Sequence, residues 1–171
     1  MKKIIQGVVI LFFGLATVKS QETGKIKVNA GLAYGTEVGI DGGGLGINLG
    51  GEYFITDEIS AAPSYSSFFE DSEGPVSANF SAVNIDGRYY FLNDDFYIYG
   101  LLGLSILSFD IETPLGPFGS IESSDSETGL NVGGGIVYPL DDQFDLNGQL
   151  KYQTPGDGQI VLNLSLVFNI N

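Results

Sequence analysis

The stretch Gly51-Glu-Tyr-Phe-Ile-Thr-Asp-Glu-Ile59 recurs in altered form as Tyr89-Tyr-Phe-Leu-Asn-Asp-Asp-Phe96 and as Val137-Tyr-Pro-Leu-Asp-Asp-Gln-Phe144. Each copy ends an apolar run on an aromatic residue, passes through acidic or amide residues, and resumes with a large apolar residue. Asp and Asn favour tight turns because their side chains hydrogen-bond to nearby backbone. Aligned aspartates of the three copies lie 37 and 48 residues apart, which fits strand–loop–strand units rather than a solenoid repeat. The chain is therefore predicted to fold as a series of β-hairpins.

The N-terminal residues have the layout of a secretory signal peptide. A basic start, Met1-Lys-Lys, precedes the nearly continuous apolar run from Ile4 to Val18, and Val18-Lys19-Ser20 offers small residues at a cleavage position. This run is too short to cross a bilayer as a mature helix. We expect residues 1–20 to be a signal peptide and residues 21–171 to form one domain; a buried N-terminal strand or helix is the alternative.

Composition narrows the function classes. The chain has 25 glycines in 171 residues, 12% aromatic residues and no long helical pattern, which favours an all-β fold with many turns. It has no Cys and no His, which removes thiol chemistry and the commonest general base and metal ligand. Loss of the three signal-peptide lysines would take the net charge from −14 to −17. Such a chain repels nucleic acid, and we expect no cofactor.

Apolar and polar residues alternate with period two in eight segments. Most of these segments are longer than the ~5–6 residues of ordinary strands, and they match a tilted membrane crossing. The fifth segment is apolar on both faces, so its register is ambiguous. The segments cover residues 25–34, 45–55, 59–65, 83–91, 96–109, 130–138, 144–152 and 160–170.

The polar face of these segments decides which way the apolar face points. A lipocalin-like soluble barrel and a membrane barrel both alternate apolar and polar residues with period two. The apolar face points inward in the soluble barrel and outward in the membrane barrel. Here the polar positions hold amides, glycines and a few charges that balance, rather than the Lys and Glu of a water-washed exterior. We interpret the balanced charges as a self-neutralising network in a narrow lumen, with the apolar face toward lipid. The network comprises Lys27, Arg88 and Lys151 with Glu52, Asp86 and Asp145.

Aromatic residues and connection lengths support a membrane barrel. Outward aromatics are predicted to form two belts, as the two interfaces of a bilayer select. One belt comprises Tyr53, Tyr89, Phe91, Phe96, Tyr138, Phe144 and Phe168, and the other Tyr34, Tyr65, Phe69 and Tyr152. Short turns around 56–58, 93–95 and 141–143 alternate with longer connections at 35–44, 70–79 and 110–127, and with a brief one at 154–158. In an outer-membrane barrel, the short turns are periplasmic and the long loops extracellular.

The predicted extracellular loops carry eleven acidic residues and no Lys or Arg. Hard cations take oxygen ligands, so weak calcium or magnesium binding is one interpretation, and solubility through mutual repulsion is the other. None of the loops has the Asp/Asn spacing of a dedicated calcium loop. In the third loop, Leu115 and Phe118 between acidic flanks are the candidates for contact with a surface partner.

The eight-segment pattern, the repeated Tyr-Phe-Ile/Leu-x-Asp turns and the terminal alternating strand resemble the OmpA/OmpX-like outer-membrane β-barrel proteins of Gram-negative bacteria. The resemblance covers about Lys25 to Asn171. It implies an eight-stranded antiparallel up-and-down transmembrane β-barrel in the outer membrane, in contact with lipid and inserted by the barrel-assembly machinery. That machinery reads a terminal aromatic in family members; Phe168 has that place here, with three residues after it.

The predicted function is non-enzymatic: a structural, envelope-integrity or adhesion role through the acidic loops. The alternative is a narrow pore or small-ligand carrier through the lumen. A barrel enzyme is the third reading, and it is disfavoured because family enzymes generally rely on His. The sequence names no extracellular partner.

Overall fold

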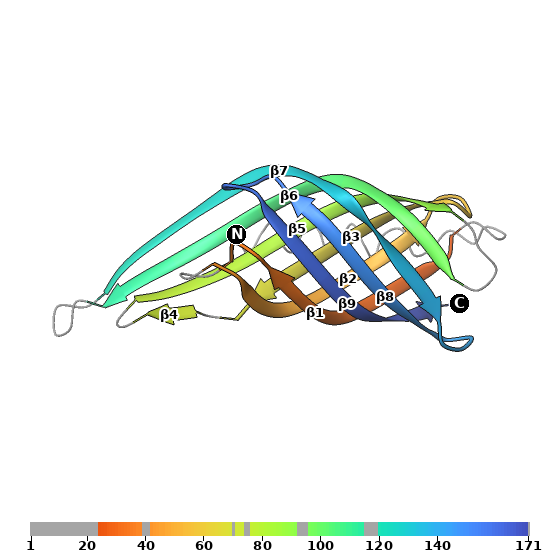
Figure 1. Cartoon of the computed structure of the whole chain (residues 1–171), viewed down its shortest axis with the longest axis horizontal. Coiled ribbons are helices and arrows are strands. Elements are labelled where there is room, and N and C mark those ends of the chain that lie inside the picture. Colours follow the sequence, from red (N-terminus) through yellow and green to blue (C-terminus); the bar gives the residue numbers. More distant parts are fainter. Residues whose placement is uncertain are drawn as a thin grey trace.

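The computed structural model describes residues 24–38, 42–69, 71–73, 76–91, 96–114 and 120–170. Eight long strands and one short strand form a single antiparallel sheet that closes on itself (Figure 1). The barrel closes because β1 pairs with β9 and β3 pairs with β5. The strands are β1 (Ile26–Gly35), β2 (Gly44–Phe54), β3 (Ile59–Phe68), β4 (Asp71–Glu73), β5 (Val76–Phe91), β6 (Tyr97–Pro114), β7 (Ser120–Pro139), β8 (Phe144–Gln153) and β9 (Gln159–Ile170). The predicted eight-stranded up-and-down barrel is confirmed, and the predicted signal peptide lies outside the described residues.

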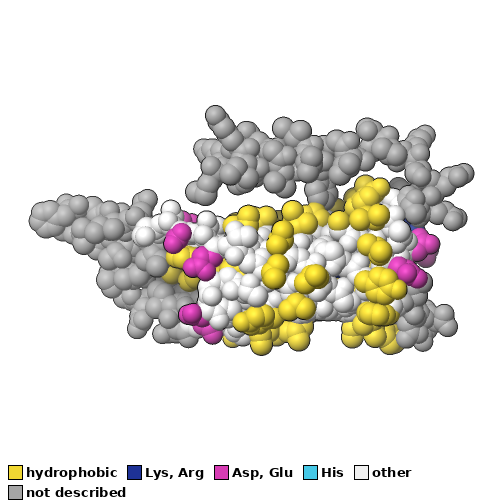
Figure 2. All heavy atoms as spheres, turned by 90° about the horizontal axis from the view of Figure 1, so that it is seen from above, with side chains coloured by type: hydrophobic (Ala, Val, Ile, Leu, Met, Phe, Trp, Pro, Cys, Tyr) yellow, Lys and Arg dark blue, Asp and Glu magenta, His cyan; other side chains and the backbone are white. Residues whose placement is uncertain are grey.

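Side chains alternate between the outside and the inside of this barrel as the sequence predicts. In β9, Leu164 is 56% exposed, whereas its neighbours Asn163 and Ser165 are buried. In the ambiguous β6, the even positions such as Leu102 point outward and the odd positions such as Leu101 are buried. Figure 2 shows apolar side chains over the middle of one face and Asp and Glu side chains at its two ends. The outer surface therefore presents an apolar band between two acidic ends.

Two short turns define one end of the barrel, which we call the short-turn end. Thr56 Oγ1 accepts hydrogen bonds from the N–H groups of Glu58 and Ile59. Asp141 Oδ1 accepts from the N–H groups of Gln143 and Phe144. The third turn, around 93–95, lies outside the described residues. Five of the seven aromatics predicted for this end are exposed: Tyr53, Tyr89, Phe91, Tyr138 and Phe168.

At the opposite end, β5, β6 and β7 reach well beyond the other strands (Figure 1). The ladder between β6 and β7 runs without a bulge to the pair Pro114↔Ser120, whereas β7 pairs with β8 only from Asn131 onward. We call the part beyond the barrel, 71–73, 76–80, 106–114 and 120–130, the protruding sheet. The prediction of long loops at 110–127 and 70–79 is therefore wrong for the described residues of both ranges, which are strands. Residues 123–128 of β7, for example, are exposed at every position and so lack the apolar alternation used to find strands.

None of the described segments is a helix of the length and apolar character that a membrane span requires.

Candidate functional site: a filled lumen and a protruding acidic sheet

The six charged residues predicted for the lumen lie on the inner face of the barrel and form three ion pairs. Lys27 Nζ is 2.8 Å from Asp145 Oδ2, Arg88 Nη1 is 2.9 Å from Glu52 Oε2, and Lys151 Nζ is 3.2 Å from Asp86 Oδ2. Each pair joins strands that are not neighbours in the sheet: β1 with β8, β5 with β2, and β8 with β5. The pairs therefore bridge the interior between strands with one strand between them, or two in the case of Lys151 and Asp86.

The partners differ from the expected ones. The sequence favours a bridge between Asp86 and Arg88, two residues apart on one strand, with Glu52 and Asp145 also within reach of Arg88. Only Glu52 reaches Arg88; Asp86 pairs with Lys151, and Asp145 with Lys27. Alternate residues of a strand are held about 7 Å apart with parallel side chains. Both side chains therefore extend across the lumen rather than toward each other.

Arg88 is surrounded by uncharged partners as well as Glu52. Its Nη2 donates to Gln149 Oε1 at 2.8 Å, and its guanidinium lies 4.6 Å from the centre of the Tyr99 ring. Glu52 in turn accepts from the hydroxyls of Tyr90 and Ser60. The predicted network contained only charged residues, so it did not include the hydroxyl groups of Tyr90 and Ser60 or the amide of Gln149. Tyr90 could have been found, since it shares the even-numbered face of β5 with the two charged residues.

An amide layer lies next to this network, farther from the short-turn end. Gln153 Nε2 donates to Asn84 Oδ1 at 2.7 Å and to Ser105 Oγ at 3.0 Å. Asn131 Nδ2 donates to Asp86 Oδ1 at 2.7 Å, which links the amides to the Lys151 ion pair. Polar side chains thus fill the middle of the barrel by bonding one another.

Apolar clusters close both ends of the polar region. At the short-turn end, Phe54, Tyr90 and Tyr99 pack with ring centroids 5.4 and 5.2 Å apart, together with buried Leu101 and Val137. At the protruding end, Ala33, Val38 and Phe68 form a second buried cluster, with Phe80 packed against it. The interior is therefore layered as apolar, polar and apolar, which suits a filled barrel better than an open channel.

Four buried polar atoms of the described lumen have no hydrogen-bond partner: Asn84 Nδ2, Arg88 Nε, Gln159 Oε1 and Asn163 Oδ1. Buried polar groups are ordinarily bonded to protein or to ordered water.

The protruding sheet has a different character. Residues 123–128 of β7 are exposed at every position, so both faces of this strand meet water. Asp110, Asp125 and Glu127 are acidic members of the sheet, and the chain has no Lys or Arg after Lys27 except Arg88 and Lys151, both in the lumen. Among the described side chains, no group of three or more acids is arranged to hold a metal ion. Leu115 and Phe118 lie outside the described residues.

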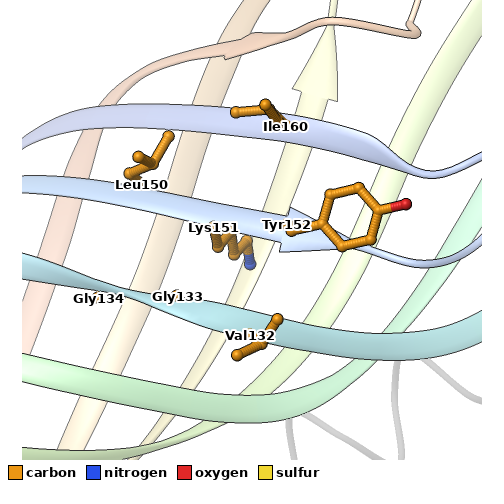
Figure 3. A pocket seen from close by; sticks show the side chains of 7 residues that line it. All are labelled: Val132, Gly133, Gly134, Leu150, Lys151, Tyr152 and Ile160. Atoms are coloured by element: carbon orange, nitrogen blue, oxygen red, sulfur yellow. The ribbon is translucent and has the colours of Figure 1, made fainter.

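A groove of about 450 Å³ lies on the outer surface between β7 and β8 (Figure 3). Val132, Leu150, Tyr152 and Ile160 line it together with Gly133, Gly134 and Lys151, and the absence of a side chain at Gly134, on the outward face of β7, widens it. The four apolar side chains among these belong to the exposed apolar band. Its lining suits a hydrocarbon chain rather than a polar ligand.

Comparison with known families gives one match, to the outer membrane protein beta-barrel domain, over residues 8–165. Comparison with characterised protein sequences gives no match.

Several solved structures share the fold. Ail, the attachment invasion locus protein of Yersinia pestis, in complex with the heparin analogue sucrose octasulfate, superposes with a TM-score of 0.65 at 20% identity, covering 86% of this chain and 99% of that chain. The N-terminal barrel of Pseudomonas aeruginosa OprF gives 0.57 at 21% identity, with coverage of 86% and 99%. OprG from the same bacterium gives 0.61 at 14% identity, with coverage of 89% and 98%. At these identities the likeness concerns the fold.

Proposed function

The chain belongs to the outer membrane protein beta-barrel domain family, and from this premise we propose that it is a non-enzymatic surface-contact protein. The barrel is its anchor in the outer membrane, and the protruding sheet is its contact surface. Residues 1–20 are the signal peptide, the barrel-assembly machinery inserts the mature chain, and the short turns face the periplasm. The observation that carries the proposal is the continuation of β6 and β7 beyond the barrel, where residues 123–128 of β7 are exposed at every position.

The charge of the protruding sheet indicates the class of partner. Its described surface carries Asp110, Asp125 and Glu127, and the basic residues nearest in sequence are buried inside the barrel. Ail has been solved with a heparin analogue, a polyanion. The same kind of ligand would meet only repulsion here, since polyanion binding needs Lys and Arg. A cationic protein surface on another cell or in the surrounding matrix fits this sheet.

The test is adherence of a non-adherent Gram-negative host that displays the protein. The test variant neutralises the β6–β7 part of the sheet by changing Asp110, Glu112, Glu122, Asp125 and Glu127 to Asn or Gln. The matched control neutralises the short turns by changing Asp57, Glu58, Asp141 and Asp142. We expect the first set to abolish adherence to immobilised cationic proteins and to cell monolayers, and the second to leave it intact. Equal adherence of host cells with and without the protein would refute the proposal.

A narrow water path through the lumen is the second candidate. The four unpartnered polar atoms favour it, because they lie inside the barrel and call for water. The apolar clusters at both ends oppose it. Planar-bilayer conductance separates the two: a filled barrel gives no steady single-channel current, and a pore does.

A further inference from the structure

Asp86, Lys151 and Asn131 form a buried group in the lumen that serves neither anchoring in lipid nor contact at the protruding sheet. Asp86 Oδ2 lies 3.2 Å from Lys151 Nζ, and Asp86 Oδ1 accepts a hydrogen bond of 2.7 Å from Asn131 Nδ2. One carboxyl group therefore connects a primary amine to a primary carboxamide. All three residues are buried, so bulk water has little access to them.

The strand register places the amine beside the carboxamide. Lys151 of β8 is paired with Gly133 of β7, and Asn131 lies two residues along β7 on the same inward face. Diagonal neighbours of this kind are about 7–8 Å apart, a distance that a long side chain spans. Gly133 leaves room for the lysine, since a Cβ there would stand 2.6 Å from Lys151 Cα.

The carbonyl oxygen of Asn131 has a hydrogen-bond donor of its own. Gln153 Nε2 donates to Asn131 Oδ1 at 3.2 Å, and Gln153 is also buried. A donor at this oxygen stabilises the negative charge that develops when a nucleophile adds to the neighbouring carbon. The nitrogen that would then leave, Nδ2, is the atom that Asp86 contacts. A nucleophile, a proton carrier, an electrophile and an oxygen donor are thus all present at one place.

The partner of Lys151 can convert its ammonium group into a nucleophile. Loss of solvation makes a buried ion pair costly, and transfer of one proton from Nζ to Asp86 removes both charges. An uncharged Lys amine in a desolvated site is an activated nucleophile. Among the described residues, Asp86 is the one hydrogen-bond partner of Nζ, so no second described carboxylate holds the amine in its charged form.

We propose that Lys151 and Asn131 form an intramolecular isopeptide bond that covalently joins β8 to β7 inside the folded barrel. Nζ bonds to Asn131 Cγ, the bond from Cγ to Nδ2 breaks, and ammonia leaves. Asp86 takes two protons from Nζ in turn, gives one to Nδ2 and keeps the other, so it ends uncharged and no oxidant or co-reactant is consumed. The bond goes beyond the proposed function, because it holds the barrel together whatever the protruding sheet contacts.

Digestion by trypsin tests the bond, because Arg88 and Lys151 are the only trypsin sites after Lys27. The full mature chain is refolded from urea into detergent, denatured again by boiling, and digested. An amide at Nζ abolishes cleavage after Lys151. Residues 89–171 should therefore appear as one peptide that is lighter than its sequence by one ammonia. The same chain digested before refolding should give two separate peptides, 89–151 and 152–171.

Three variants identify the reacting groups. Lys151→Arg keeps the positive charge and removes the amine, so the refolded chain should keep its full mass. Asp86→Asn keeps the size of the side chain and removes the proton carrier, so the refolded chain should again be cleaved after Lys151. Lys27→Arg alters the other lumen lysine and is the matched control, which should still resist cleavage after Lys151. Gel migration without boiling verifies that each variant is folded.

The parent chain alone decides the proposal, even if a variant fails to refold. Recovery of the peptide 152–171 from the refolded parent would overturn it. Formation of a succinimide at Asn147 before Gly148 also releases ammonia, but it leaves Lys151 open to trypsin. A refolded chain that is lighter by one ammonia and is still cleaved after Lys151 would therefore overturn the proposal as well. Neither result depends on the outcome of the adherence test.

Discussion

Replacement of Lys151 by Ala should be among the most destabilising single changes in the barrel. Lys151 and Asp86 are each 1% exposed, and their ion pair crosses the lumen. Without Lys151, the Asp86 carboxylate keeps Asn131 as its one described hydrogen-bond donor. Breaking a buried pair by removing one partner costs about 3–5 kcal/mol, because the other charge is left uncompensated. The free energy of unfolding should fall by that amount.

Arg88 provides the comparison. After Arg88→Ala, Glu52 still accepts from the hydroxyls of Tyr90 and Ser60. Hydrogen bonds to a charged group each contribute roughly 1.5–3 kcal/mol, so the remaining donors offset part of the loss. Arg88→Ala should therefore cost less than Lys151→Ala, although Arg88 has the larger number of described partners.

The assay is urea unfolding in lipid, followed by tyrosine fluorescence and by gel migration without boiling. Double-mutant cycles identify the partners: Lys151→Ala with Asp86→Ala should show a coupling energy of about 0.5–3 kcal/mol, and Arg88→Ala with Asp86→Ala should be close to additive. Additive losses for Lys151 and Asp86, or strong coupling of Arg88 to Asp86, would refute the pairing in the lumen. A loss below about 1 kcal/mol for Lys151→Ala would show that water solvates the freed carboxylate.

Leu164→Arg should impair insertion by roughly 2–4 kcal/mol because Leu164 faces lipid. If liposome insertion assays show Asn163→Arg to be the more harmful change, the lipid-facing and lumen-facing residues have been exchanged. Neutralising Asp125 and Glu127 together should leave heat-modifiable migration unchanged, because these exposed side chains add little to barrel pairing; loss of the folded band would mean that the sheet supports the barrel. Tyr99→Ala should open the apolar layer at the short-turn end and raise proton or ion leakage of liposomes above that of the parent; unchanged leakage would place the seal elsewhere.

The barrel itself is predictable from residue patterns. The unbroken alternation of β9, from Ile160 to Ile170, is enough to identify its lipid face, because a lipid-facing strand has a strict apolar period. The interior charges are likewise recognisable as charges on the polar face of otherwise apolar strands. In both cases one local pattern carries the information.

The pairing of the charges and the protruding sheet are not predictable in the same way. Which acid meets Arg88 depends on the register and curvature of strands far apart in the sequence, so Glu52 could not be preferred over Asp86. The part of β7 beyond the barrel, where residues 123–128 are exposed at every position, lacks the alternation that marks a strand. Its extended form is set by the ladder with β6, which a local pattern does not report.

The barrel is proposed to hold its acidic sheet outside the cell. Because the chain has no cysteine, single introduced cysteines test this placement most directly. Single cysteines replace Ser124 in the protruding sheet and Gln143 in a short turn, and intact cells are treated with a membrane-impermeant maleimide. Labelling of Ser124→Cys in intact cells, and of Gln143→Cys only after the outer membrane is permeabilised, is the expected result. Labelling of Gln143→Cys in intact cells while Ser124→Cys stays protected would contradict it.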